Sequence, residues 1–316
     1  MRPPLDRDGS GGGLRASGTV HATVGGVYTV VLDDGRQVEA SLRGRLKKER
    51  GPGERVVIGD RVVVEAAGDA WTVEAVEERE TAFVRRGHGG RGRKVVAANL
   101  DRVVVVVAAR DPDPSPELVD RLLVVAEASG MHPLLVLNKV DLEGGAERAE
   151  ELEELYRRVG YRVLPTSADT GEGLEALAGE ICSGSSALVG PSGVGKSTLL
   201  NAIDPELDLS TGALSRKTGR GRHTTTNARL LRLSCGGLVA DTPGFGDVGL
   251  WGLEPEELDA CFPEMRPFLG RCRFRGCAHL HEPDCAVLAA VEDGEIPRSR
   301  WESYAVLREE AAPPPW

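Results

Sequence analysis

The stretch ALVGPSGVGKSTLLNAI, residues 187–203, decides the fold. Its segment from Gly190 to Ser197 fits the pattern G-x4-G-K-[ST] at every position. The apolar residues before this segment predict a strand, and those after it predict a helix that starts near Lys196. In this context the backbone N–H groups of the glycines wrap phosphates, the lysine neutralises phosphate oxygens and the serine hydroxyl can bind Mg²⁺. We therefore predict a nucleoside triphosphate site in an α/β domain of the P-loop type.

A second motif, VLNKVDL at 136–142, follows another predicted strand. We expect the Asp141 carboxylate to accept hydrogen bonds from guanine N1–H and the exocyclic amine, a donor pair that adenine lacks. Asn138 would contact the other edge of the base, and the Lys139 stem would pack against the ring. The next predicted strand ends in Thr166, Ser167 and Ala168, whose backbone could contact guanine O6. Because a tetrapeptide is weak evidence by itself, an ATP-using protein in which NKVD has no role is the alternative.

The motif DTPG at 241–244 also lies at the end of a predicted strand. Asp241 is placed to hold Mg²⁺ through water, and the N–H of Gly244 is placed to meet the γ-phosphate. Between this motif and the phosphate loop lies GRGRHTTTNA, residues 219–228, the expected position of a loop that orders around Mg²⁺ and the γ-phosphate. One of its three consecutive threonines, Thr224–Thr226, should contact the metal, and the sequence does not choose among them.

The five nucleotide elements therefore occur in the order base, base, phosphate, switch, switch, whereas an ordinary GTPase has its base motifs last. Strands alternating with helices from residue 99 to 248 predict a doubly wound α/β sheet. If the usual ends of such a sheet are joined and the chain is reopened after DTPG, each strand keeps its place and only the connectivity changes. We therefore predict a circularly permuted GTPase domain, with Mg²⁺ bound together with GTP.

The predicted GTP-binding residues are those of the motifs described above. They are Asn138, Lys139, Val140, Asp141, Thr166, Ser167, Ala168, Gly190, Pro191, Ser192, Gly193, Val194, Gly195, Lys196, Ser197, Thr198, Asp241 and Gly244, with Ser197 and Asp241 as the predicted magnesium ligands.

The segments that flank this domain differ from it in pattern. Residues 1–17 are predicted to be a flexible tail, and residues 18–82 alternate in short strands that predict an all-β barrel, most simply an OB-fold, although pattern alone also allows an SH3-like barrel. Residues 83–98 are expected to form a basic linker. From residue 249 to 316 the chain reads as short helices with a cysteine cluster, which predicts a small C-terminal zinc-binding domain.

Composition limits the class of protein. The chain has 316 residues and a net charge of −10, which argues against a uniformly basic nucleic-acid binder. Three local runs at 43–50, 85–94 and 215–232 are nevertheless basic, and they are interpreted either as solvated loops or as phosphate contacts. No signal peptide is visible, and the longest apolar run is too short to cross a membrane. We expect a cytoplasmic protein that is not bound to a membrane and has no repeated interface, hence a monomer.

The six cysteines do not suggest a disulfide framework. Three of them occur with two histidines in RCRFRGCAHLHEPDC, residues 271–285. Cys272, Cys277, Cys285 and one imidazole would make a closed tetrahedral site for one structural Zn²⁺, with either His279 or His281 as the fourth ligand. The remaining cysteines, which are expected to be small core residues, are Cys182, Cys235 and Cys261.

This combination resembles the RsgA family, also called YjeQ or YloQ, of circularly permuted GTPases. The resemblance covers nearly all of the chain from Gly18 to about Trp301, and it rests on the barrel, the motif order NKVD–TSA–GPSGVGKST–DTPG and the cysteine cluster. It favours His279 over His281 as the zinc ligand. It also implies that the chain binds the small (30S) ribosomal subunit through its rRNA, assists the subunit's late maturation and uses GTP hydrolysis to time release.

Hydrolysis is expected to be slow without the subunit. Phe245 follows Gly244 where many GTPases carry a glutamine that orients the attacking water, and an apolar side chain cannot do this. The resemblance implies His223 as the catalytic residue that positions this water, whereas the alternative is an RNA phosphate contact. The alternative function is a nucleotide-gated RNA-binding switch in which hydrolysis is incidental. A permuted GTPase that acts on the large subunit is disfavoured by the barrel and the zinc site together.

Overall fold

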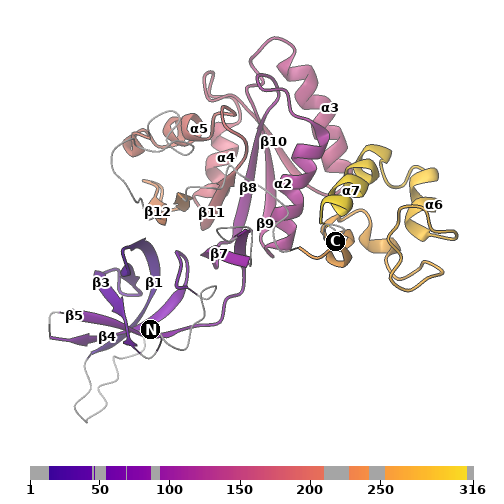
Figure 1. Cartoon of the computed structure of the whole chain (residues 1–316). Helices are drawn as coiled ribbons and strands as arrows, with labels where there is room; N and C mark the ends of the chain where they lie inside the picture. The colour runs from indigo at the N-terminus through magenta and orange to yellow at the C-terminus, as the bar shows by residue number, and fades with distance from the viewer. Residues whose placement is uncertain are drawn as a thin grey trace, which may run out of the picture.

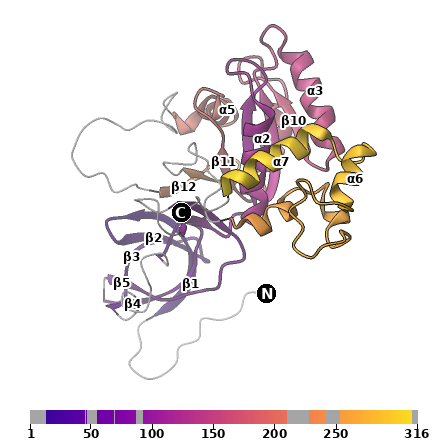
Figure 2. The ribbon, with the colours of Figure 1, turned by 45° about the vertical axis from the view of Figure 1, so that its right-hand side comes forward.

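The computed structural model describes residues 14–44, 46, 55–68, 70–86, 93–209, 228–241 and 253–311. Figure 1 shows three parts: an N-terminal barrel, a central α/β domain and a C-terminal domain of short helices. The barrel and the C-terminal domain contact the α/β domain on different sides, and Figure 2 shows the same arrangement after a 45° turn.

The N-terminal part is a closed five-stranded barrel. Its strand order is β1-β2-β3-β5-β4, and β4 pairs back to β1, which is the order of an OB-fold. Alternation along the strands sends Val20, Val30, Val62 and Val73 into a buried core. This confirms the predicted barrel. The strands are β1 (Arg15–Val24), β2 (Val27–Leu32), β3 (Gln37–Leu42), β4 (Arg61–Ala67) and β5 (Ala70–Val76).

A two-stranded hairpin follows the barrel, made of β6 (Ala82–Arg86) and β7 (Arg93–Ala98). It occupies the segment in which we expected a linker. Gly59 lies against it so closely that a Cβ there would fall 1.8 Å from the Ala98 carbonyl oxygen, so the position requires glycine. The hairpin thus packs on the barrel and leads directly into the α/β domain.

The α/β domain is built on a mostly parallel sheet with the order β10-β9-β8-β11-β13-β12. Within this part of the sheet, β12 is antiparallel to its neighbour β13. The strands are β8 (Arg102–Ala108), β9 (His132–Asn138), β10 (Arg162–Thr166), β11 (Ser185–Val189), β12 (Ala228–Arg232) and β13 (Leu238–Asp241). The helices are α2 (Pro116–Ala128), α3 (Gly145–Arg158), α4 (Leu174–Ile181) and α5 (Lys196–Ile203), with the short helix η2 (Pro205–Leu207) after α5.

Helices cover both faces of this sheet, which explains why β8 is apolar at successive positions. Val103 and Val105 pack with residues of α2 and α3, whereas Val104 and Val106 pack with residues of α4 and α5. The two cores therefore alternate residue by residue along one strand, as the doubly wound fold requires.

The barrel and the α/β domain share one continuous sheet. β1 pairs antiparallel with β12, with Ala22 opposite Arg229 and Thr23 opposite Ala228, so that 11 strands are hydrogen-bonded in sequence. The sequences of β1 and β12 gave no indication of this pairing, because it joins residues about two hundred positions apart.

The C-terminal domain has little regular structure. It contains the short helices η3 (Pro255–Glu257), η4 (Asp259–Cys261) and η5 (Arg266–Phe268), followed by α6 (Ala286–Glu292) and α7 (Arg298–Ala311). Phe262 and Tyr304 meet edge to face in its core, with ring centroids 5.5 Å apart. None of the helices in the described ranges is long and apolar enough to span a membrane.

The C-terminal domain is joined to α2 by a buried charge network. Arg300 on α7 is fully buried and forms ion pairs with Asp120 on α2 and Glu264. Tyr156 on α3 donates a 2.7 Å hydrogen bond to the same Asp120 carboxylate. A guanidinium buried on this scale is stable only when it is paired, so the network fixes α7 against the α/β domain.

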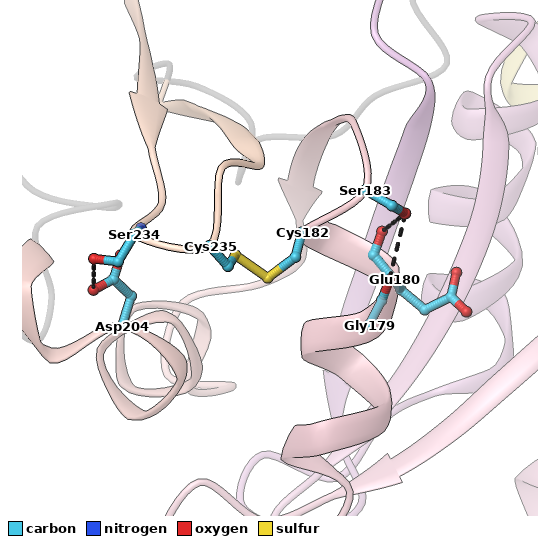
Figure 3. The surroundings of a disulfide bond; sticks show 7 residues. All are labelled: Gly179, Glu180, Cys182, Ser183, Asp204, Ser234 and Cys235. Carbon is cyan, nitrogen blue, oxygen red and sulfur yellow. Dashed lines mark hydrogen bonds between the residues drawn. A yellow bond between two sulfur atoms is a disulfide. The ribbon is translucent and has the colours of Figure 1, made fainter.

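The expectation that Cys182 and Cys235 are small core residues was wrong. They form a disulfide (Figure 3). Cys182 is half-buried and Cys235 is exposed. The two cysteines lie 53 positions apart, and the parallel pairing of β11 with β13 brings their segments together. The third expected core cysteine, Cys261, is indeed buried.

Candidate functional site

The predicted motifs all leave the sheet at its carboxyl edge. Asn138 ends β9 and lies in register with Ala108 of β8 and Thr166 of β10. β11 runs parallel to both β8 and β13, so the phosphate loop after Val189 and the motif that starts at Asp241 emerge at the same edge. In doubly wound folds, ligands bind outside this edge.

Asn138 connects the base motif to the phosphate loop. Its amide is buried and donates a 2.8 Å hydrogen bond to the carbonyl oxygen of Val194. Its oxygen accepts a 3.2 Å bond from the Thr166 hydroxyl. The sequence suggested that Asn138 contacts the base, whereas the structure places its amide between two other motifs. Segments that are 56 residues apart in the chain therefore meet directly.

The phosphate loop depends on glycine for its path. Gly190 has φ 148°, and a Cβ there would lie 2.0 Å from the carbonyl oxygen of Val106. Gly195 has φ 96°, and its Cβ would lie 2.3 Å from the Asn138 amide nitrogen. A side chain at position 190 would therefore clash with the backbone of β8, and one at position 195 would displace the Asn138 amide and require a φ that favours glycine.

Lys196 and Ser197 are the first residues of α5 and both are buried. The Lys196 ammonium donates 2.8 Å hydrogen bonds to the carbonyl oxygens of Gly190 and Pro191, so that it lies folded over the loop. Burial lowers the pKa of Lys196 to about 8. A triphosphate at this helix N-terminus would give the Lys196 ammonium a negatively charged partner in place of the neutral carbonyl oxygens.

The remaining base-motif residues divide between core and surface. Val140 is buried, whereas Asp141 is exposed at the edge. Lys139 has φ 64°, and its ammonium donates to the carbonyl oxygen of Asp111. The exposed Asp141 carboxylate lies after the strand end where a base would be recognised.

The segment after β10 is a closed turn. Thr166 and Ser167 are fully buried, and Ala168 is half-buried. The Ser167 hydroxyl accepts a 3.1 Å bond from the N–H of Thr170, and the Ser167 N–H donates to the carbonyl oxygen of Glu172 at 3.0 Å. This hydrogen-bonded turn lies beside Asn138 and thus next to the phosphate loop.

Asp241, the last residue of β13, forms a 3.1 Å ion pair with Arg229 on the neighbouring strand β12. Sequence reasoning did not find Arg229, because only the β12–β13 register places it opposite Asp241. Gly244, Phe245, His223 and the threonines Thr224–Thr226 lie outside the described residues. Most of the basic run 215–232 also lies outside them.

The cysteine cluster forms a compact set of donors. One ligand atom from each of Cys272, Cys277, His279 and Cys285 lies within 4.8 Å of all the others. The sulfurs of Cys272 and Cys285 are 3.8 Å apart, and His279 Nδ1 lies 3.5 and 3.3 Å from them, respectively. A tetrahedral zinc ion would separate two thiolate sulfurs by about 3.8 Å and a sulfur from a nitrogen by about 3.5 Å. The donors therefore fit this metal.

The same geometry chooses between the two histidines. His279 is buried within the cluster, whereas His281 is exposed and does not belong to it. A ligand to a closed structural site must face its partners, so His279 is the imidazole of this Cys3His set.

The family of the chain follows from three comparisons. The family model described as RsgA GTPase matches residues 76–251, which is more than half of the chain. A small ribosomal subunit biogenesis GTPase RsgA from Gemmatimonas aurantiaca is 48% identical over 300 residues, which cover 93% of this chain and 97% of that protein. A protein of the same name from Moorella thermoacetica is 44% identical over 289 residues, which cover 91% of this chain and 94% of the relative.

Two solved structures share the architecture. YjeQ from Thermotoga maritima superimposes with a TM-score of 0.77 at 35% identity, covering 94% of this chain and 99% of that one. YloQ, described as a circularly permuted GTPase, superimposes with a TM-score of 0.73 at 32% identity, covering 94% and 95% of the two chains. The base motif precedes the phosphate loop in the sequence and contacts it in space, as expected for a circular permutation. The chain belongs to the RsgA family of circularly permuted GTPases.

Proposed function

We propose that this chain is a GTPase that binds the small (30S) ribosomal subunit, assists its late maturation and uses GTP hydrolysis to control its own release. The observation that carries the proposal is the hydrogen bond from Asn138 to the carbonyl oxygen of Val194, because contact between the base motif and the phosphate loop supports one shared nucleotide site. The ribosomal target is supported by relatives that are named small ribosomal subunit biogenesis GTPases.

We assign guanine recognition to Asp141 and phosphate binding to the loop from Gly190 to Thr198. Lys196 would neutralise the β- and γ-phosphate oxygens, and Ser197 and Asp241 would hold the Mg²⁺ that accompanies GTP. The exposure of Asp141 and the position of Asp241 at the same edge support these roles. The Lys139 stem would pack against the base, the backbone of residues 166–168 would contact guanine O6, and the Gly244 N–H would meet the γ-phosphate.

Hydrolysis is assigned to a water positioned by His223. The chain carries Phe245 where a water-orienting glutamine is common, so turnover should be slow until the ribosomal subunit orders the site. We expect His223→Ala to lower subunit-stimulated turnover strongly while GTP affinity stays within about twofold. Unchanged stimulated turnover in His223→Ala would reject this role.

We assign one structural Zn²⁺ to Cys272, Cys277, His279 and Cys285. The fit of the donor distances to a tetrahedral ion supports this assignment. When bound, the ion supplies a rigid crosslink of the loop and no chemistry of hydrolysis. The protein is proposed to act as a monomer in the cytoplasm, without a membrane partner.

The basic run 215–232 and the barrel are the proposed rRNA contacts. The run has no acidic residue, and an OB-fold is a common nucleic-acid module. Contacts of this kind are made mainly to phosphates, so affinity for the subunit should fall steeply with salt. We infer domain boundaries at residues 18–82, 83–98, 99–248 and 249–316 for the barrel, the linker segment, the GTPase domain and the C-terminal domain.

The deciding experiment is GTP turnover with purified 30S subunits across a salt series. Stimulation that weakens as salt rises supports an enzyme activated by the ribosomal subunit. Salt-sensitive binding of the subunit without stimulation would favour the alternative, a nucleotide-gated RNA-binding switch in which hydrolysis is incidental.

Base specificity is tested with Asp141→Asn. The carboxylate accepts charge-assisted hydrogen bonds worth about 1.5–3 kcal/mol, so we expect the affinity for GTP to fall about 10- to 100-fold and the preference to move towards xanthosine triphosphate. Glu143→Gln, a neighbouring exposed position, is the matched control. Equal binding of ATP and GTP by the unmodified protein would contradict the assignment.

A further inference from the structure

The two ring nitrogens of His279 face different partners. Nδ1 faces the sulfurs of Cys272 and Cys285 at 3.5 and 3.3 Å. Nε2 lies 3.3 Å from a carboxylate oxygen of Asp259, on the short helix η4. Because the imidazole is almost fully buried, Asp259 is placed to accept the Nε2 proton inside the domain and away from bulk water.

The backbone around His279 is also held in place. Trp301 on α7 donates a 2.8 Å bond to the His279 carbonyl oxygen, and Tyr304 on the same helix donates a 2.8 Å bond to that of Ala278. The Glu282 carboxylate accepts from three backbone N–H groups of the same turn, at 2.8, 3.0 and 3.2 Å. His279 itself has φ 59°, in the left-handed region that few residues other than glycine adopt.

We propose that Asp259 is a positioning residue for the metal centre: its carboxylate accepts a hydrogen bond from Nε2–H of His279 and so keeps the proton on Nε2 and the lone pair on Nδ1, which faces the thiolates. A metal-binding histidine commonly donates its second ring N–H to a carboxylate, which fixes the tautomer and the ring orientation and makes the imidazole a better ligand. The inference rests on the proposed zinc site and adds the residue that orients its only nitrogen ligand.

The test uses the full-length protein and Zn²⁺ itself. Zinc affinity is measured by competition with a chromophoric chelator for the unmodified chain, Asp259→Asn and Asp259→Ala. We expect Asp259→Ala to lose about 10- to 100-fold in affinity and Asp259→Asn to lose less, because an amide oxygen still accepts the proton. The visible absorption of the Co²⁺-loaded protein should change in the same order.

Asp284→Asn is the matched control, because Asp284 is an exposed carboxylate near the cluster that pairs with Arg273. It should leave zinc affinity within about twofold. If the unmodified chain binds zinc with one ion per molecule and Asp259→Ala binds equally well, this inference is wrong and the zinc site stands. If the unmodified chain binds no zinc, both fail.

A second and independent observation concerns the disulfide. Cys182 directly follows α4, and Cys235 lies in the turn between β12 and β13 (Figure 3). Ser234 holds the same turn: its N–H and its hydroxyl donate hydrogen bonds of 2.7 and 2.9 Å to the Asp204 carboxylate. The segment closed by the disulfide contains the phosphate loop, α5 and β12, and Cys235 in the turn is exposed to reagents in solution.

We further propose that this disulfide is a redox-responsive crosslink of the hairpin that carries Arg229 and Asp241. A dithiol of the thioredoxin class would reduce it: one thiolate attacks a cysteine sulfur, the S–S bond breaks, and the second thiolate completes the exchange, leaving two protein thiols and one oxidised dithiol. A disulfide oxidant such as oxidised glutathione reverses the reaction. Disulfides are rare in reducing compartments, and those that do form there are usually transient and either catalytic or redox-sensing.

The test combines thiol counting with thermal unfolding. Alkylation of the zinc-free, unfolded chain should label four cysteines after oxidation and six after reduction. Reduction should lower the Tm of the unmodified protein by about 5–10 °C and leave Cys182→Ser/Cys235→Ser unchanged. This double variant also controls for effects of the reductant on the zinc thiolates. Six labelled cysteines after treatment with oxidised glutathione, or equal Tm shifts in both proteins, would overturn the proposal.

Discussion

In the α/β domain the candidate nucleotide site is positioned by backbone pairing, whereas in the C-terminal domain the candidate metal site is positioned by polar side chains. Asn138, Thr166 and Asp241 all end strands of one sheet, whose apolar residues are buried on both faces. The residues around His279 belong instead to short turns and to α7. The described residues of the C-terminal domain form no strand, and its cluster of buried apolar residues is smaller than either cluster of the sheet, so a metal bound by the cysteine cluster would contribute a large share of its stability.

The largest effect should come from the metal ligands. Cys285 is buried and also caps α6, because its sulfur accepts from the N–H of Leu288. Since structural zinc contributes about 10–16 kcal/mol of apparent binding free energy in small domains, Cys285→Ser or a strong chelator should unfold residues 253–311. Hydrogen exchange should show that the amides of residues 253–311 lose protection while those of β8 and β9 keep it. Exchange that spreads through the sheet would show that the two regions are not independent.

The next largest effect should come from the buried charge network of Arg300, Asp120 and Glu264, where the C-terminal domain contacts the α/β domain. Asp120→Ala leaves Arg300 buried beside Glu264 alone and should cost about 3–5 kcal/mol of unfolding free energy, measured by urea denaturation. Glu117→Ala removes an exposed ion pair with Arg121 on the same helix and should cost less than about 1 kcal/mol. Similar losses for both variants would mean that the buried network does not hold the domains together.

A smaller effect is expected at the sheet edge. Asn138→Ala removes hydrogen bonds to both Val194 and Thr166, and it leaves the Val194 carbonyl without that donor. An unsatisfied buried group costs about 1–3 kcal/mol, so GTP affinity measured by calorimetry should fall about 5- to 100-fold. Thr166→Val removes one of these bonds and should cost less. Equal affinities in all three proteins would show that the edge does not depend on this contact.

The smallest effect is a pH dependence of nucleotide binding. The pKa of Lys196 in the folded, nucleotide-free chain is about 8, below its ordinary 10.5, because of burial. Above about pH 8 the lysine is neutral, so binding a triphosphate must take up a proton and GTP affinity should fall by up to about tenfold per pH unit. Calorimetry in buffers of different ionisation enthalpy measures this uptake.

The same shift has an opposite sign for folding. Between about pH 8 and 10.5 the unfolded chain holds a proton on this lysine that the folded, nucleotide-free chain lacks, so this group makes the free energy of unfolding rise with pH. Lys196→Arg does not titrate in this range and is the control for both measurements. If the unmodified protein takes up no proton when it binds GTP, the predicted titration of Lys196 near pH 8 is wrong.

The sequence alone determined the class of each region. Periodicity and motif spacing predicted the barrel, the doubly wound sheet with its permuted motif order, and a cluster of three cysteines and one histidine, because each of these is recognised from short local patterns along the chain. The choice of His279 over His281 came from the family resemblance, and the geometry of the cluster agrees with it. Thiolates and an imidazole in close spacing indicate a metal site wherever the rest of the chain lies.

Tertiary structure alone decided the contacts between regions. Several contacts join residues whose neighbours in the sequence give no sign of a partner. They are the pairing of β1 with β12, the Arg229–Asp241 ion pair, the Cys182–Cys235 disulfide and the buried ion pair of Arg300 with Asp120. Asn138 shows the same limit at one residue: its type and strand position were predicted, but its hydrogen bond to Val194 was not. Strand register and domain docking set such contacts, and both depend on the whole chain packing at once.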